Sequence, residues 1–231
     1  MEKIILIETS TALCSVALAE NGTVTSYRES SAQKAHASLT AVFIQEMLQE
    51  RGLTLADCDA VCVSKGPGSY TGLRVGVSTA KGLCFGSGKP LLAVGTLDTL
   101  VAQAVEEISE APRFIIPMID ARRMEVYTAV FSNENGTYTQ TTETAPAIID
   151  ETSFAEYLEQ GPCLFIGDGA GKCADVIKHP NAHFSQCWPK ASSMLAPALA
   201  AYRSADFQDV AYFEPFYLKE FVATVSKKKM W

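Results

Sequence analysis

The sequence predicts an α/β protein made of two similar halves. Two observations support this: runs of β-branched residues alternate with helix-length apolar segments, and the order of these segments recurs along the 231 residues. Each half is expected to hold a β-meander, then a helix, a strand, a glycine-containing turn and another helix. Because Ala111-Pro112 separates the two patterns, we expect an N-terminal lobe at residues 1–110 and a C-terminal lobe at residues 111–231.

The first half opens with three predicted strands and a helix. Residues 4–7 form a continuous apolar run, typical of a buried strand, and Asn21-Gly22 is a strong hairpin signal between the next two strands. The helix expected over 35–51 ends at Gly52, which favours a left-handed cap. Its apolar residues cover more than half of its circumference, whereas packing on a sheet needs a stripe of about 100°. We therefore expect one face to pack on the sheet and a second face to bind a partner.

A glycine-rich turn between a strand and a helix is the most distinctive feature of the chain, with the sequence KGPGSYTGLRVG at residues 65–76. Pro67-Gly68 is typical of a tight turn, and Ser69 or Thr71 is expected to cap the helix that follows. Such a turn can bind an anion, because free amides and the positive end of the helix dipole meet there. An ordinary structural turn explains the same residues, so both alternatives stay open.

Small residues recur at every fourth position in the helix after this turn, at Gly72, Gly76 and Ala80. A glycine inside a helix costs about 1 kcal/mol relative to alanine, so the row predicts that another backbone approaches closely. That backbone belongs either to the chain's own sheet or to another subunit, and the pattern does not decide between them.

The second half repeats the outline of the first. Residues 114–119 are predicted to form a buried strand, residues 133–136 a hairpin turn, and residues 167–171 a glycine-rich turn that enters a helix. A further apolar helix is expected over 191–204. An extended segment near the end contains Pro215, which confines that segment to a sheet edge or a coil.

The composition is that of ordinary globular material with an acidic balance. The net charge is −7 and the pI is about 5.0, which argues against a broad nucleic-acid surface on this chain. The seven cysteines are an odd number and most lie in apolar patterns, so we expect buried thiols rather than disulfides. With no signal-peptide pattern and no apolar run of membrane-spanning length, we expect a cytoplasmic protein. The basic residues Lys227 to Lys229 are expected to form a solvated tail.

Residue patterns that indicate catalysis are weak. His179 and His183 have the spacing of a metal-binding pair, but Pro180 lies between them and disfavours a regular helix. The sequence has no P-loop pattern, and none of its three histidines suggests a Ser-His-Asp triad. The sequence therefore predicts no catalytic residue and no metal ligand.

Four motifs together resemble the TsaB (YeaZ) family. They are ILIETST at 5–11, GPGSYTGLRVG at 66–76, DARRMEVY at 120–127 and PFYLK at 215–219, so the resemblance runs from the first strand to near the C-terminus. It implies the actin/sugar-kinase/heat-shock-ATPase fold (ASKHA, ribonuclease H-like), with two lobes that face a cleft. The family more often has Asp at the position of Glu8 and often has Gly at the position of Met124.

The resemblance implies a role in tRNA modification. TsaB is the dimerisation subunit of the bacterial complex that makes threonylcarbamoyladenosine in tRNA, and it is an inactive paralogue of TsaD, which carries the chemistry. TsaD has an HxxxH metal motif after a strand equivalent to 91–94, whereas residues 95–100 of this chain contain no histidine. We therefore expect a non-catalytic scaffold that binds a TsaD-like partner for threonylcarbamoylation of the adenosine next to the anticodon.

The same resemblance implies the partners and cofactors. A TsaD-like paralogue forms a heterodimer with the chain, a TsaE-like ATPase joins the larger complex, tRNA binds only through the complex, and the isolated chain forms a homodimer. No cofactor is required and no membrane is involved. The predicted partner interface lies on the helices that begin near residues 35 and 69, and consists of Ala37, Ala41, Ile44, Leu48, Gly72, Leu73, Gly76, Val77 and Ala80.

Two enzymatic alternatives stay open. A small-molecule kinase or ATPase of the same fold would bind ATP or ADP weakly between the lobes, with Glu8 near a magnesium ion and Asp168 facing the same cleft. A metallopeptidase would need a metal site that these residues do not supply. The predicted nucleotide-binding residues are Glu8, Thr9, Ser10, Gly167 and Gly169.

Overall fold

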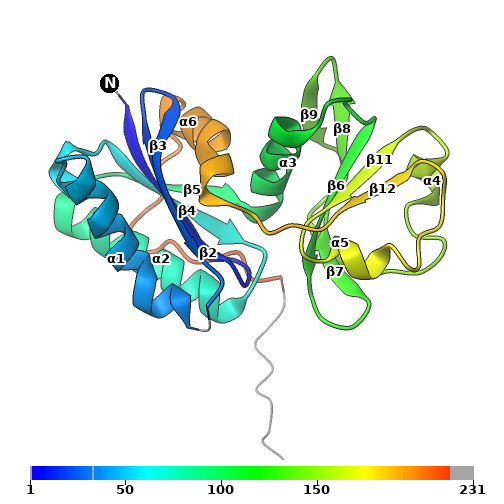
Figure 1. The fold of residues 1–231 in the computed structure, drawn as a ribbon, viewed down its shortest axis with the longest axis horizontal. Helices are drawn as coiled ribbons and strands as arrows, with labels where there is room; N and C mark the ends of the chain where they lie inside the picture. The colour runs from blue at the N-terminus through cyan, green and yellow to red at the C-terminus, as the bar shows by residue number, and fades with distance from the viewer. Residues whose placement is uncertain (1, 33, 219–231) are drawn as a thin grey trace, which may run out of the picture.

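Two β-sheets organise the protein in a computed structural model, which describes residues 2–32 and 34–218 (Figure 1). The first sheet has five strands in the order β3-β2-β1-β4-β5. Its strands are β1 (Lys3–Glu8), β2 (Cys14–Glu20), β3 (Thr23–Ser30), β4 (Ala60–Gly66) and β5 (Leu91–Gly95).

The first sheet combines a meander with parallel crossover strands, as the sequence predicts. Strand β1 is buried along nearly its whole length and pairs antiparallel with β2 and parallel with β4. The predicted hairpin turn at Asn21-Gly22 has φ angles of 54° and 78°, the left-handed conformation that this turn type requires. Strand β5 continues the parallel part beside β4.

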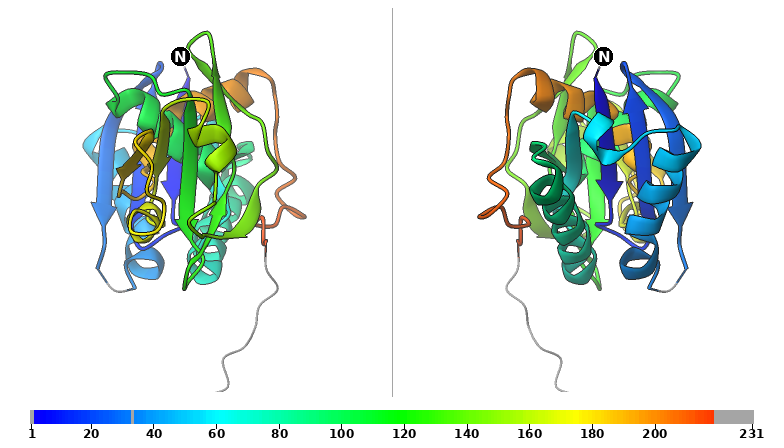
Figure 2. Two further views of the ribbon diagram at one scale, coloured as in Figure 1. Left: turned by 90° about the vertical axis from the view of Figure 1, so that its right-hand side faces the viewer. Right: turned by 90° about the vertical axis from the view of Figure 1, so that its left-hand side faces the viewer.

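One face of the first sheet is covered by α1 (Ala35–Glu50) and α2 (Tyr70–Ser87), which lie side by side (Figures 1 and 2). The short 3-10 helix η1 (Leu55–Asp57) connects α1 to β4. Large apolar side chains of both helices, such as Ile44 and Val77, pack on Ile5, Ile7 and Val63 of the sheet. This packing fixes the two helices relative to the sheet.

The second sheet forms the other lobe and has the order β10-β7-β6-β11-β12; in addition, β8 pairs with β6, and β9 pairs with β8. Helix α3 (Thr96–Glu107) joins the lobes and buries Leu97 and Leu100 against Ile115 and Ile166 of this sheet. The strands are β6 (Phe114–Asp120), β7 (Glu125–Thr128), β8 (Phe131–Glu134), β9 (Thr137–Gln140), β10 (Ala145–Ile148), β11 (Cys163–Ile166) and β12 (Ala182–Ser185).

The helices of the second lobe are shorter than the repeated outline predicts. Helices α4 (Ala155–Leu158) and α5 (Ala170–Cys173) are single turns. Phe154 adopts a left-handed φ of 63°, which interrupts the helix that the repeated outline predicts after the meander of this half. The two lobes therefore share their sheet topology more than their helices.

The chain returns to the first lobe after β12. The 3-10 helix η2 (Ala191–Met194) and helix α6 (Leu195–Arg203) pack Met194 and Ala198 on Ile4 and Leu6 of the first sheet. A bridge between Leu91 and Gln208 extends this contact. The predicted C-terminal lobe of 111–231 thus contains a segment that covers the second apolar face of the N-terminal sheet, an arrangement that no local pattern in the sequence predicts. The predicted basic tail at 227–229 lies outside the described residues.

Among residues 2–32 and 34–218, no helix combines the length and the apolar character that a bilayer crossing requires.

Candidate functional site

The small-residue row of α2 packs on the turn that follows β1. A Cβ atom added at Gly72 would lie 2.1 Å from the carbonyl oxygen of Thr9, and one added at Gly76 would lie 2.2 Å from Thr9 Oγ1. The Ser69 amide donates to the Ser10 carbonyl at 2.6 Å, next to Gly68, whose added Cβ would lie 2.3 Å from that oxygen. The backbone that approaches this helix so closely is therefore the chain's own.

Most of the predicted partner interface is consequently buried inside the monomer. The sequence pattern left open whether this side of α2 meets the chain's own sheet or another subunit, and large apolar residues at helical spacing are the ones that cover a sheet. Leu73 and Val77 pack in the core, where they are shielded from any other subunit. The predicted interface residues that lie buried in the monomer are Ile44, Leu48, Gly72, Leu73, Gly76, Val77 and Ala80.

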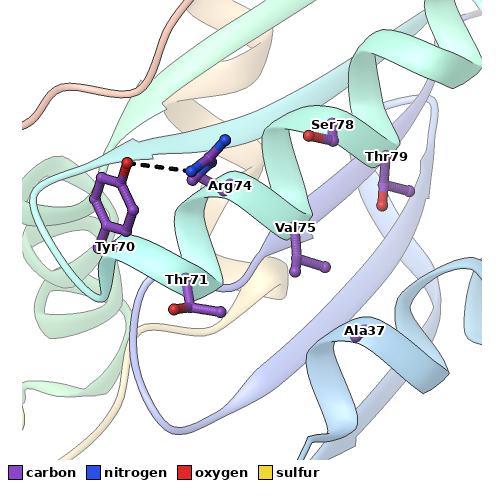
Figure 3. Close-up of a pocket in the computed structure, with 7 residues that line it drawn as sticks. All are labelled: Ala37, Tyr70, Thr71, Arg74, Val75, Ser78 and Thr79. Carbon is purple, nitrogen blue, oxygen red and sulfur yellow. Dashed lines mark hydrogen bonds between the residues drawn. The ribbon is translucent and has the colours of Figure 1, made fainter. Parts of the chain in front are cut away.

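Ala37 and Ala41 are the two predicted interface residues that lie exposed, on the outer side of α1. Between α1 and the outer side of α2 lies a shallow groove of about 480 Å³ (Figure 3). Small and hydroxyl-bearing side chains dominate its walls. The groove is lined by Ala37, Tyr70, Thr71, Arg74, Val75, Ser78 and Thr79.

The outer face of α2 ends in a protruding aromatic residue that the sequence reasoning missed. Phe85 is 87% exposed, the largest exposure among the large hydrophobic side chains that the structure describes. Thr71, Ser78 and Phe85 are seven residues apart, so they fall on one side of the helix. This spacing could have indicated an exposed face of the helix, but the inner row is more apolar and gave the stronger pattern.

Arg74 brings a positive charge to the groove and is held by Tyr70. Its Nη1 donates to the Tyr70 hydroxyl at 3.2 Å, and its guanidinium carbon lies 5.3 Å from the centre of the Tyr70 ring (Figure 3). The Tyr70 ring also contacts the ring of Tyr217, with centroids 4.9 Å apart. The end of the groove nearest the N-terminus of α2 is therefore an ordered aromatic and cationic cluster.

Glu8, which the kinase alternative places near a magnesium ion, is fully buried at the end of β1. Its Oε1 accepts the Ser10 amide at 2.6 Å, and burial raises its pKa to about 7. Within the described residues, Oε2 of Glu8 and the hydroxyls of Thr9, Ser10 and Thr11 have no hydrogen-bond partner. Because α2 packs over this turn, Glu8 and Thr9 do not face the space between the lobes.

The space between the lobes is a cleft of about 730 Å³. Of the predicted nucleotide residues, Ser10 lines it, and Asp168 lines it from the other lobe. Gly167 and Gly169 do not. A Cβ atom at Gly167 would lie 2.3 Å from the Met118 carbonyl oxygen, so these glycines serve the packing of their turn on β6.

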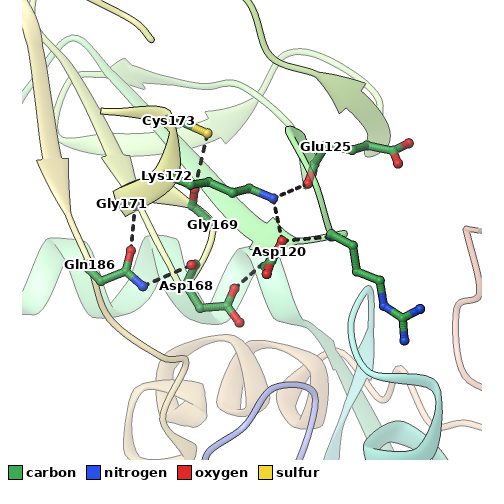
Figure 4. Close-up of polar contacts among 9 residues, drawn as sticks. Asp120, Glu125, Asp168, Gly169, Gly171, Lys172, Cys173 and Gln186 are labelled. Carbon is green, nitrogen blue, oxygen red and sulfur yellow. Dashed lines mark hydrogen bonds and ion pairs between the residues drawn. The ribbon is translucent and has the colours of Figure 1, made fainter. Parts of the chain in front are cut away.

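Asp168 joins two turns of the second lobe (Figure 4). Its Oδ1 accepts the Asp120 amide at 2.9 Å, while Lys172 pairs with the Asp120 carboxylate and donates to the Glu125 carbonyl at 2.6 Å. Burial is the main cause that raises the pKa of Asp168 to about 6. This network locks the turn after β6 to the turn after β11, and it does not bring Asp168 together with the buried Glu8.

Two of the three histidines make hydrogen bonds with backbone groups. The His36 ring Nε2 lies 2.9 Å from the Thr11 carbonyl oxygen, and His179 Nδ1 accepts the Asn181 amide at 3.1 Å. His183 lies in strand β12. Among the residues described by the structure, no group of three or more His, Cys, Asp or Glu side chains is placed to hold a metal ion.

Comparisons with known proteins agree on one family. The family model for TsaD, tRNA N6-adenosine threonylcarbamoyltransferase, matches residues 28–213. The Escherichia coli tRNA threonylcarbamoyladenosine biosynthesis protein TsaB is 32% identical over 227 residues, 96% of each chain.

Solved structures give the same result. YeaZ from Pseudomonas aeruginosa superposes with a TM-score of 0.83 at 26% identity, over 94% of this chain and all of that one. A polyphosphate/ATP-glucomannokinase from Arthrobacter shares the fold alone, with a TM-score of 0.51 at 12% identity over 88% of this chain and all of the kinase. The two-lobed fold is thus the actin/sugar-kinase type that the sequence predicts, and the chain belongs to the TsaB (YeaZ) family of tRNA threonylcarbamoyladenosine biosynthesis proteins.

Proposed function

We propose that the chain is a non-catalytic scaffold subunit that binds a TsaD-like paralogue for threonylcarbamoylation of the adenosine next to the tRNA anticodon. Family membership supports the pathway, and the exposed outer face of α1 and α2 supports the scaffold role. The observation that carries this proposal is the groove between these helices, which is lined mainly by small and hydroxyl-bearing side chains, together with the exposed Phe85 near the end of α2.

The outer face of α1 and α2 suits a helical partner. Small residues such as Ala37, Ala41 and Ser78 allow helix axes to approach within about 8 Å. Helix α2 has 18 residues, about 27 Å at 1.5 Å per residue, long enough for a contact of the standard size of about 800 Å² per partner. Burial of the exposed phenyl ring of Phe85 would contribute the most to the binding free energy, since aromatic residues dominate interface energetics.

The remaining partners follow from this assignment. A TsaD-like partner has a related fold, so its equivalent helices would form the other half of the contact. The same surface would self-associate when that partner is absent, giving a homodimer. A TsaE-like ATPase would join the larger complex, and the tRNA would be held there by other subunits, since this chain carries a net charge of −7.

The test is co-elution of the chain with its TsaD-like paralogue, measured by size-exclusion chromatography with light scattering. Ser78→Arg places an unpaired charge in the groove and should weaken binding by at least about tenfold, because burying such a charge costs several kcal/mol. Thr139→Arg, on the exposed strand β9 of the other lobe, is the matched control and should bind as the parent does. Normal co-elution of Ser78→Arg would show that the partner binds elsewhere.

The enzymatic alternatives are tested with the purified chain alone. Weak ATP or ADP binding in the cleft stays a prediction, and titration calorimetry measures it directly. A kinase or ATPase would need a carboxylate near the phosphates; Glu8, the residue predicted for that place, is buried behind α2, whereas Asp168 lines the cleft. Steady hydrolysis of ATP by the isolated chain would contradict the scaffold proposal, and stoichiometric zinc or iron after purification would support a metallopeptidase.

A further inference from the structure

The groove between α1 and α2 and the cleft between the lobes are lined in part by the same residues. Tyr70 and Thr71, at the start of α2, line both spaces, whereas Tyr217 lines the cleft only. The Tyr217 ring lies against the Tyr70 ring at 4.9 Å with an interplanar angle of 36°. Arg74 contacts the same Tyr70 ring and faces the groove. A continuous chain of contacts thus leads from the C-terminal segment to the partner surface.

The segment that carries Tyr217 is anchored on the first lobe. Lys81 of α2 donates to the carbonyls of Ala211 and Phe213 at 3.1 and 3.0 Å, and the Phe216 amide donates to the Lys65 carbonyl at 2.7 Å. Gly66 leaves room for this crossing, because its added Cβ would lie 2.9 Å from the Phe216 carbonyl oxygen. These contacts hold Phe216, the residue before Tyr217, at the glycine-rich turn.

We propose that Tyr217 is a positioning residue for the partner surface: it packs against Tyr70, and Tyr70 in turn holds the Arg74 guanidinium at the groove. This inference rests on the proposed function of the groove. Tyr217 itself does not line the groove, so its effect on binding must pass through its neighbours.

The physical basis is preorganisation. An arginine side chain has many rotamers, and fixing it on binding costs about 0.5–1.5 kcal/mol unless it is already held. The hydroxyl and the ring face of Tyr70 hold Arg74, and Tyr217 limits the rotation of Tyr70 toward the cleft. Removing the Tyr217 ring therefore removes one restraint on the Tyr70 ring, and the Arg74 guanidinium is held less firmly at the groove.

The experiment measures the affinity of the full chain for its TsaD-like paralogue by titration calorimetry. Tyr217→Ala should weaken binding about threefold to tenfold, the effect of losing one aromatic pair. Tyr217→Phe keeps the ring and should bind within about twofold of the parent. In an Arg74→Ala background, Tyr217→Ala should cause no further loss, because the proposed effect passes through Arg74.

Controls separate positioning from general destabilisation. Tyr212→Ala alters an 84% exposed ring of the same segment and should leave affinity unchanged. If Tyr217→Ala fails to fold, Tyr217→Leu keeps apolar volume without the flat ring and should show the same loss.

Parent-like affinity of a folded Tyr217 variant that lacks the ring would overturn the inference, as would full additivity with Arg74→Ala. If those results appear while Ser78→Arg still disrupts binding, the positioning role fails and the partner surface stands. Parent-like binding of Ser78→Arg would overturn both.

Discussion

Replacing the buried Glu8 by glutamine should remove a pH-dependent loss of stability. Burial raises the pKa of this carboxyl from 4.5 to about 7. The folded state therefore binds the proton more tightly than the unfolded state does. The contribution of Glu8 to the free energy of unfolding is thus largest below pH 4.5, and it is lost as the pH rises toward 7. At 1.36 kcal/mol per pKa unit, the ionised carboxylate costs the folded state about 3 kcal/mol.

The measurement is urea unfolding of the parent and of Glu8→Gln at several pH values between 5 and 8. Glutamine keeps an oxygen to accept the Ser10 amide and carries no charge, so the free energy of unfolding of the variant should rise relative to the parent by about 2–3 kcal/mol over this range. Asp168 titrates in the same direction in both proteins, so only the difference between them is informative. Glu46→Gln, at an exposed position of α1, is the control for the removal of one negative charge. A parent that gains stability relative to Glu8→Gln as the pH rises would refute the assignment.

Two further predictions separate the inner and outer faces of α2. Gly72→Ala should lower the melting temperature, because its Cβ would lie 2.1 Å from the Thr9 carbonyl oxygen, whereas Gly82→Ala, with open space around it, should stabilise the helix by about 1 kcal/mol. Thermal unfolding of both variants measures this, and a harmless Gly72→Ala would contradict the close packing. Phe85→Ala should weaken binding to the TsaD-like paralogue by about 2 kcal/mol with an unchanged melting temperature, since the ring is exposed in the monomer. Calorimetric titration tests it, and unchanged affinity would remove Phe85 from the interface.

The sheet topology could be predicted from local patterns, because each signal depends on neighbouring residues. The apolar run of β1 and the Asn21-Gly22 turn produce the expected meander, and the glycine-rich turn enters a helix at Tyr70. The return of α6 to the first sheet could not be predicted in this way. Its position depends on which apolar face is left uncovered after the rest of the chain has folded.

The partner surface was harder to predict because two different causes give the same pattern. Gly72 and Gly76 lie at the spacing of a helix contact between subunits, yet the partner that they approach is Thr9. Sequence spacing specifies which residues share a helix face, but it does not specify what lies opposite. Exposure of Ala37 and Phe85 becomes known only when the sheet is in place.

The geometry of the glycine-rich turn favours the structural one of its two candidate roles. A phosphate cradle needs backbone amides that point into open space at the start of the helix. Here the Ser69 amide donates to the Ser10 carbonyl, and the Gly72 amide donates to the Ser69 hydroxyl at 3.3 Å. Gly68 and Gly72 bring α2 so close to the turn after β1 that a phosphate has no room between them. The turn therefore sets the position of α2, and with it the outer face on which the proposed partner contact depends.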